Sequence, residues 1–77
     1  MGREGGSDTI MILVNGMPHV TANESLSYDE VVARSGLLSD LLTITYRRAK
    51  PPRTEGTLAR GASALARDGT IFNVAHT

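Results

Sequence analysis

Few side chains in this sequence could act as acid–base catalysts or nucleophiles. His19 and His76 are the only histidines, and the chain contains no cysteine. A catalytic site would hold such a histidine within hydrogen-bonding reach of a hydroxyl and a carboxylate, but neither histidine stands in a catalytic motif. Because His19 falls on an expected strand, it is better explained as a half-exposed strand residue than as a base. We therefore expect that the chain is not an enzyme.

Two adjacent acids, Asp29 and Glu30, are the other candidates for proton transfer. They stand at the expected start of a helix, where negative charge is favoured by the helix dipole, and this position explains them without catalysis. A metal site needs three or four ligands, and no cluster of ligand residues offers them. We expect no metal and no cofactor bound by this chain.

Composition places the chain among small globular domains. It has 77 residues, 40% of them hydrophobic, and a formal net charge of zero, which allows one domain with a modest core. Residues 1–40 carry six acidic and two basic residues, a balance of −4, and residues 41–77 carry the reverse, +4. The basic half can be an ordinary solvated surface or a patch that meets an acidic protein surface. With three aromatic residues and no nucleic-acid motif, we expect no nucleic-acid binding.

The N-terminal segment, residues 1–8, has the composition of a flexible leader. It carries three glycines and no apolar stretch, so it does not resemble a signal peptide. The longest apolar run, Ile10 to Val14, is too short to span a membrane. Together with the absence of cysteine, these features lead us to expect a cytoplasmic domain that does not contact a membrane.

A hairpin is expected near the N-terminus. Thr9–Val14 is aliphatic and β-branched, Asn15-Gly16 follows it, and Met17–Thr21 returns as a second strand. Asn-Gly suits a type I′ turn, which requires φ > 0 at both central residues. Pro18 cannot donate to a ladder, so the second strand is expected at a sheet edge.

The clearest local signal is a helix start. Ser27 and Glu30 have the spacing of a capping box, and Gly36 provides a C-terminal cap, which together predict a helix over Tyr28–Ser35. Eight residues are too few for a stable isolated helix, so this one must pack on a sheet. The helical segment is expected to bury Val31, Val32 and, just beyond it, Leu38.

The remaining chain predicts further strands. They are Leu42–Arg47, a short strand at Gly56–Leu58 and a last strand at Thr70–Val74, with loops at Lys50–Arg53 and Asp68-Gly69. This pattern predicts an α+β domain in which the helix crosses one sheet face and the first and last strands lie side by side and parallel in the middle. The expected core consists of Ile10, Ile12, Val14, Val31, Val32, Ile44, Phe72 and Val74.

Four segments in order resemble the bacterial multiubiquitin family, whose members are ubiquitin-like β-grasp domains. They are Ile12–Gly16, Ser27–Val32, Thr45–Arg48 and Asp68–Val74. The resemblance covers about residues 9–75 and implies a ubiquitin-like β-grasp with a mixed four- to five-stranded sheet and one helix. It leaves residues 76–77 as a C-terminal tail.

The resemblance also implies a function, that of a protein modifier. Its partners would be an activating-enzyme homologue, a conjugating-enzyme-like protein, a metallopeptidase of the deubiquitinase type and the target proteins. The reactive group would be the α-carboxylate of Thr77, adenylated by the activating partner with its own ATP and Mg²⁺, and Ala75 and His76 would form the tail before it. The chain departs from ubiquitin-like modifiers in lacking a terminal Gly-Gly. A non-conjugated adaptor therefore remains an alternative. A sulfur carrier, suggested by the Asp68-Gly69 turn before the last strand, is a third reading, and it is the one that the missing Gly-Gly disfavours most.

A partner-binding surface is expected on the sheet face away from the helix. Met11 and Leu13 would supply apolar contact there and Arg47 a charge beside it. The alternative is that Met11 and Leu13 belong to the core, because both faces of the first strand are apolar and a shift of one residue in register exchanges them.

Overall fold

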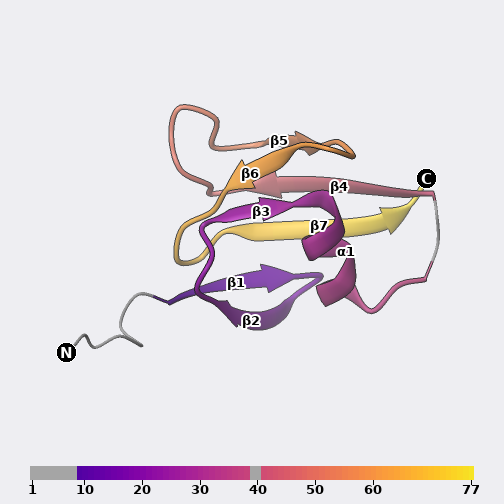
Figure 1. Cartoon of the computed structure of the whole chain (residues 1–77), viewed down its shortest axis with the longest axis horizontal. Coiled ribbons are helices and arrows are strands. Elements are labelled where there is room, and N and C mark those ends of the chain that lie inside the picture. Colours follow the sequence, from indigo (N-terminus) through magenta and orange to yellow (C-terminus); the bar gives the residue numbers. More distant parts are fainter. Residues whose placement is uncertain (1–8, 39–40) are drawn as a thin grey trace.

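The computed structural model describes residues 9–38 and 41–77, which form seven strands and one helix. The elements are β1 (Ile10–Val14), β2 (Met17–Thr21), β3 (Ser25–Ser27), α1 (Tyr28–Ser35), β4 (Leu42–Arg47), β5 (Gly56–Leu58), β6 (Ser63–Leu65) and β7 (Ile71–His76). Five strands build a mixed sheet in the order β2-β1-β7-β4-β5, and β3 pairs with β6 in a separate two-stranded sheet (Figure 1). The expected α+β architecture, with the arrangement of a β-grasp, is confirmed.

The centre of the sheet is formed by strands from the two ends of the described chain. β1 and β7 are parallel, with Leu13 opposite Ile71 and Val14 opposite Phe72, while β4 runs antiparallel on the other side of β7. β2 lies at the edge, as expected. Leu13, opposite Pro18, donates its amide N–H to the Thr70 carbonyl on the β7 side and not to β2. The backbone nitrogen of Pro18 therefore lies toward the open edge of the sheet, where no N–H is needed for strand pairing.

The hairpin has the predicted turn. Asn15 and Gly16 have φ values of 52° and 82°, which is the left-handed conformation at both central positions of a type I′ turn. The predicted pairing is also present, with Val14 opposite Met17 and Ile12 opposite His19. This register places alternate residues of β1 on opposite faces of the sheet.

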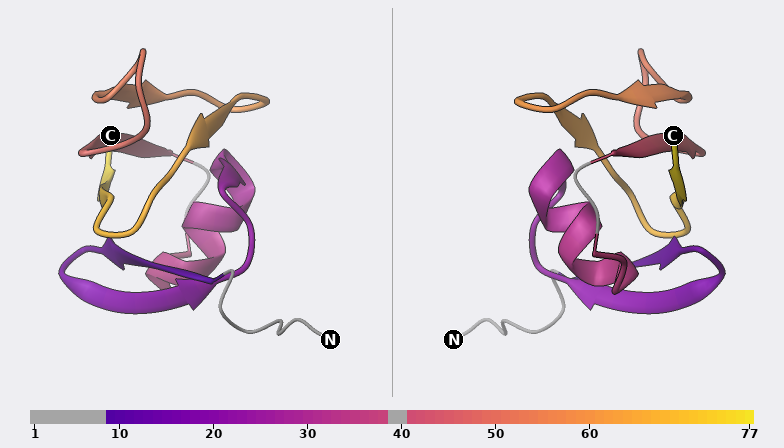
Figure 2. Two further views of the ribbon diagram at one scale, coloured as in Figure 1. Left: turned by 90° about the vertical axis from the view of Figure 1, so that its left-hand side faces the viewer. Right: turned by 90° about the vertical axis from the view of Figure 1, so that its right-hand side faces the viewer.

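The helix begins and ends where the sequence predicts. The Glu30 amide donates to the Ser27 hydroxyl at 3.2 Å, the Ser27 amide donates to the Glu30 carboxylate at 2.9 Å, and Gly36 ends the helix with φ 75°. The Tyr28 hydroxyl donates to the Leu42 carbonyl at 2.6 Å, which ties the first helical residue to β4. Figure 2 shows the helix on the concave side of the curved sheet.

The core lies between the helix and this concave face. Six of the eight predicted core residues are buried, whereas Ile10 and Val32 are only partly buried against the core. The prediction for Leu38 is wrong: its side chain is 96% exposed, because the left-handed turn at Gly36 redirects the chain and Leu37 packs against the core instead. The core also includes Leu26, Tyr28, Leu42, Tyr46, Ala49, Leu58, Ala64 and Ala66.

The small β3–β6 sheet is a further difference from the sequence prediction. Leu26 lies opposite Ala64, and both side chains are buried. Next to this sheet, the carboxylate of Glu24, the residue before β3, forms an ion pair with the Lys50 ammonium at 2.6 Å. Serine and alanine, which are not enriched in strands, make up most of both segments, so the sequence pattern contains no signal for them.

Candidate protein-binding surface on the outer sheet face

The face of the five-stranded sheet away from the helix carries the residues predicted for partner binding. Ile12 and Val14 point into the core, so Met11 and Leu13 point outward from the same strand. Directly opposed residues of neighbouring strands share a face. The outer face therefore also includes Val20 and Pro18 opposite Met11 and Leu13, and Ile71 on β7.

These five side chains form one apolar patch over β2, β1 and the start of β7, and we call it the outer apolar patch. Met11 is 42% exposed and Val20 69% exposed, while Leu13 and Ile71 are half-buried by their neighbours. The alternative assignment, in which Met11 and Leu13 are core residues, does not hold. Their exposure is that of a surface available for contact.

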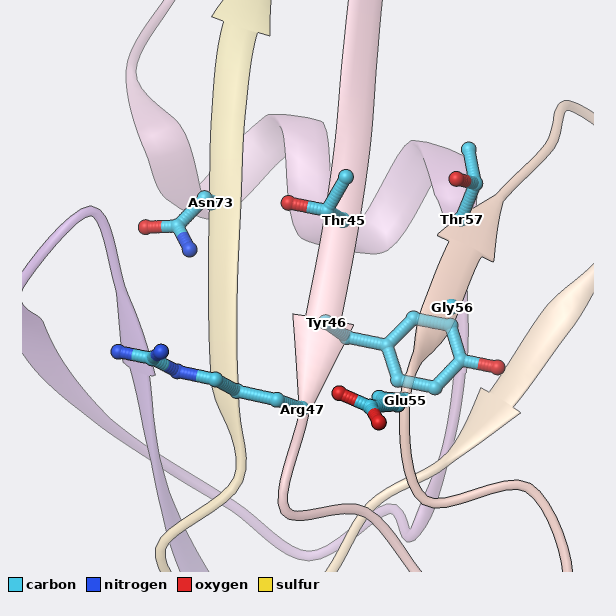
Figure 3. A pocket seen from close by; sticks show the side chains of 7 residues that line it. All are labelled: Thr45, Tyr46, Arg47, Glu55, Gly56, Thr57 and Asn73. Atoms are coloured by element: carbon cyan, nitrogen blue, oxygen red, sulfur yellow. The ribbon is translucent and has the colours of Figure 1, made fainter.

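Arg47 borders this patch. It lies opposite Ile71 on β4, so the register orders Leu13, Ile71 and Arg47 in one row across three strands. Figure 3 shows the Arg47 side chain extending from β4 across β7 toward β1. The three residues named from the sequence therefore lie on one face.

The other half of the outer face is polar. Thr57, Thr45 and Asn73 form the next row across β5, β4 and β7, and their side chains lie side by side in Figure 3. A shallow hollow of about 470 Å³ lies here, bordered also by Arg47 and Glu55. Glu55 is the one carboxylate among its lining residues, which include no histidine.

The two histidines lie far from one another in the register. His19 is half-buried on β2 opposite Ile12, and His76 is exposed on β7 opposite Leu42. Neither has a hydrogen-bonded carboxylate among residues 9–38 and 41–77.

The acidic pair at the helix start is structural. The Ser27 backbone N–H is the main cause that holds the pKa of Glu30 below its ordinary value of 4.5, and the Ser27 hydroxyl and Arg34 act in the same direction. Asp29, beside it, is exposed in the first helical turn. A carboxylate whose pKa is lowered by a cap is a weaker base, which suits a cap and not a general base.

A second charged feature lies where β4 ends, and we call it the arginine corner. The Arg48 carbonyl accepts the Thr70 hydroxyl at 2.9 Å and the Arg67 Nε–H at 3.2 Å, and the Arg67 backbone N–H donates to the same hydroxyl at 2.8 Å. Arg48 has φ 61°, a left-handed conformation that is uncommon for a residue other than glycine. A hollow of about 550 Å³ here is bordered by Arg48, Arg67, Asp68 and Gly69.

The C-terminal residues are more ordered than a tail. β7 continues through Ala75 and His76, which pair with Thr43 and Leu42. The Thr77 amide donates to the Leu41 carbonyl at 2.9 Å, and the hydroxyls of Thr77 and Thr43 lie 2.7 Å apart. Ala75 and His76, which were expected in the tail, are part of β7, because strand pairing continues to Leu42, the first residue of β4. All three residues are exposed, so the Thr77 end remains at the surface.

Neither a metal centre nor a membrane span is found in the part of the chain that the structure describes. Histidine, aspartate and glutamate side chains nowhere gather there in a group of three or more able to hold a metal ion. The helix is also neither long nor apolar enough to cross a membrane.

Several surface residues were missed by the sequence reasoning. Pro18 follows from the hairpin register and could have been placed beside Leu13. Ile71 follows from alternation with Phe72 on the last strand. The arginine corner had no such signal, because the left-handed conformation of Arg48 follows from contacts with residues 67–70.

Comparisons of this chain with protein-family models, with curated proteins and with solved structures found no match.

Proposed function

We propose that this chain is a β-grasp protein-binding domain that docks a partner protein through the outer apolar patch, with Arg47 at its border. The observation that supports this most directly is the exposure of neighbouring apolar residues on a sheet whose other face is already covered by the helix. Covering two such side chains contributes roughly 3–6 kcal/mol before ordering costs. The domain supplies a binding surface, and any catalysis belongs to its partners.

A second candidate function is that of a ubiquitin-like protein modifier, which the sequence resemblance suggests. The observation that favours it is the exposed position of Ala75, His76 and Thr77 at the end of β7. The activating-enzyme homologue would bind ATP and Mg²⁺, and the Thr77 carboxylate would attack the α-phosphorus of ATP. Pyrophosphate would leave and an acyl-adenylate would form, whose acyl carbon then reacts with a nucleophile of the partner and releases AMP.

The modifier function places a mechanical requirement on the chain end. Before Thr77 can enter an active site, its amide must leave the Leu41 carbonyl and its hydroxyl must leave Thr43. These contacts are exposed and few, so their loss costs about 1–2 kcal/mol. This second proposal also includes three kinds of partner and a location. The partners are a conjugating-enzyme-like protein, a metallopeptidase of the deubiquitinase type and the protein targets, and the location is the cytoplasm.

One binding experiment tests the first proposal. An activating-enzyme homologue, the partner that the sequence resemblance implies, is titrated calorimetrically with the wild-type chain, with Leu13→Ser and with Asn73→Ser. Leu13→Ser should weaken binding tenfold or more, because it removes an apolar contact from the patch. Asn73→Ser alters the polar half of the same face and should bind like the wild type. Equal affinities for all three chains would exclude the outer apolar patch as the docking surface.

A separate experiment tests the modifier function. The 77-residue chain is incubated with the same enzyme, ATP and Mg²⁺, and the intact mass is measured. The adenylate is the expected product. If an enzyme that is demonstrably active on ATP binds the chain but forms no adenylate, the binding proposal stands and the modifier proposal fails.

A further inference from the structure

The arginine corner is built more firmly than an ordinary solvated charge patch. Thr70 is fully buried, and its hydroxyl accepts the Arg67 amide while donating to the Arg48 carbonyl. The Arg67 Nε–H donates to that same carbonyl, which fixes the orientation of the guanidinium plane. Two of these hydrogen bonds join Arg48, the residue after β4, to the turn before β7, and the third lies within that turn.

The charged ends of this corner are left without partners. Among residues 9–38 and 41–77, the terminal nitrogens of Arg67 and the whole guanidinium of Arg48 have neither a hydrogen-bond acceptor nor an ion pair. Arg48 also keeps a left-handed backbone that glycine would adopt without strain. A strained residue held in place by its surroundings points to a role for its side chain.

We infer that the arginine corner binds a carboxylate on an acidic segment of the docked partner. Two guanidiniums that share one hollow can hold a carboxylate through charge-assisted hydrogen bonds. This inference rests on the proposed docking function, for which it names the chemistry of the partner: apolar side chains on the outer apolar patch and an acid at its border.

The local charge favours a carboxylate over a phosphoryl group. Asp68 borders the same hollow, so two positive charges and one negative charge leave a net charge of +1 there, which matches a monoanion. Asp68 is held in place because its carboxylate accepts the Met11 amide at 2.8 Å.

The corner is also continuous with the outer apolar patch. The Gly69 amide donates to the Met11 carbonyl at 2.7 Å, and Ile71, two residues further along, belongs to the patch. Arg47, which borders the patch, immediately precedes Arg48. One partner segment can therefore contact both features.

The test uses the full chain and N-acetyl-triglutamate amide as the carboxylate probe, followed at low ionic strength by ¹H–¹⁵N spectra. We expect saturable shifts at the Gly69 amide and at the Arg48 and Arg67 Nε–H signals. Arg67→Gln should weaken this binding about fivefold to tenfold. Arg48→Gly should lose it to a similar extent while unfolding at the same or a higher temperature, because glycine relieves the left-handed strain.

Matched controls decide between specific and general attraction. Arg53→Gln removes the same charge from the β4–β5 loop and should leave triglutamate binding unchanged. Equal losses in Arg53→Gln and Arg67→Gln, or shifts spread over all arginines, would overturn the inference. Tighter binding of inorganic phosphate than of triglutamate would overturn the carboxylate assignment. Leu13→Ser should keep triglutamate binding, because it changes only the outer apolar patch. The triglutamate experiment therefore tests carboxylate binding at the arginine corner separately from partner docking at the patch.

Discussion

The side-chain amide of Asn15 pairs with the backbone of Val74 as a strand would. Its Nδ2 donates to the Val74 carbonyl at 3.0 Å, and its Oδ1 accepts the Val74 amide at 2.7 Å. The Asn15 backbone amide also donates to the Phe72 carbonyl at 3.0 Å. One turn residue therefore continues the β1–β7 ladder beyond the end of β1, and it satisfies β7 groups that would otherwise lie at an open edge.

Asn15 is predicted to stabilise the sheet through this amide. Asn15→Gly keeps the left-handed turn but removes both bonds, so it should lower the free energy of unfolding by about 1–3 kcal/mol. Urea denaturation measures this loss, and hydrogen exchange should show reduced protection at the Val74 amide. Asn73→Ala, on the exposed outer face, is the control and should change stability by less than about 0.5 kcal/mol. An Asn15→Gly chain as stable as the wild type would contradict this role.

Replacing Thr70 by valine should destabilise the protein. The change keeps the side-chain shape but leaves the Arg67 amide without its acceptor and removes one donor from the Arg48 carbonyl. The expected cost is about 1–3 kcal/mol, measured by urea denaturation. Thr70→Ser retains the hydroxyl and should recover most of that loss. Equal stability of the valine and serine variants would show that the hydroxyl is not the stabilising group.

Ile12 and Leu13 are adjacent residues with opposite environments, and they form a matched pair. Ile12 is fully buried, whereas Leu13 is half-buried on the outer face. Ile12→Ala should cost about 2–5 kcal/mol because it leaves a cavity, and Leu13→Ala should cost less than half as much. Thermal and urea unfolding give both values. If the order were reversed, the assignment of the two faces would be wrong.

The capping carboxylate predicts a specific pH dependence. The folded-state pKa of Glu30 lies below its ordinary value of 4.5, so its contribution to stability is fully present above pH 4.5 and is lost as the pH falls through the lowered value. Glu30→Gln removes this titration. Its stability should be lower than that of the wild type at pH 7, and the difference should shrink as the pH falls below 4.5. A difference that stays constant from pH 7 to pH 3 would rule out this contribution of Glu30.

Local signals predicted most of the fold. The Asn15-Gly16 turn, the Ser27–Glu30 box and the alternation of Leu42–Arg47 each depend on a few adjacent residues, and all three appear as expected. The β3–β6 pair was missed because its strands consist mostly of serine and alanine, which do not favour strands. The prediction for Leu38 was wrong because the left-handed conformation of Gly36 sets the direction of the chain after the helix. The apolar character of Leu38 does not indicate that direction.

The candidate surface was likewise predictable from the sequence only in part. The sequence named Met11, Leu13 and Arg47 for this surface, and hairpin register with strand alternation would have added Pro18 and Ile71. The arginine corner was beyond sequence reasoning, because it depends on Thr70 meeting Arg48, residues 22 positions apart in the chain. The order at Thr77 was likewise hidden, since it depends on how far β4 reaches.

The parallel pairing of β1 with β7 has a consequence for synthesis on the ribosome. Leu13 meets Ile71, so the middle of the sheet cannot close until the residues of β7 have left the exit tunnel. Until then, β1 has its hairpin partner β2 on one side and an open edge on the other, and such edges favour wrong pairings. Folding must therefore follow completion of nearly the whole segment, and its rate is limited by the search for contacts distant in the chain.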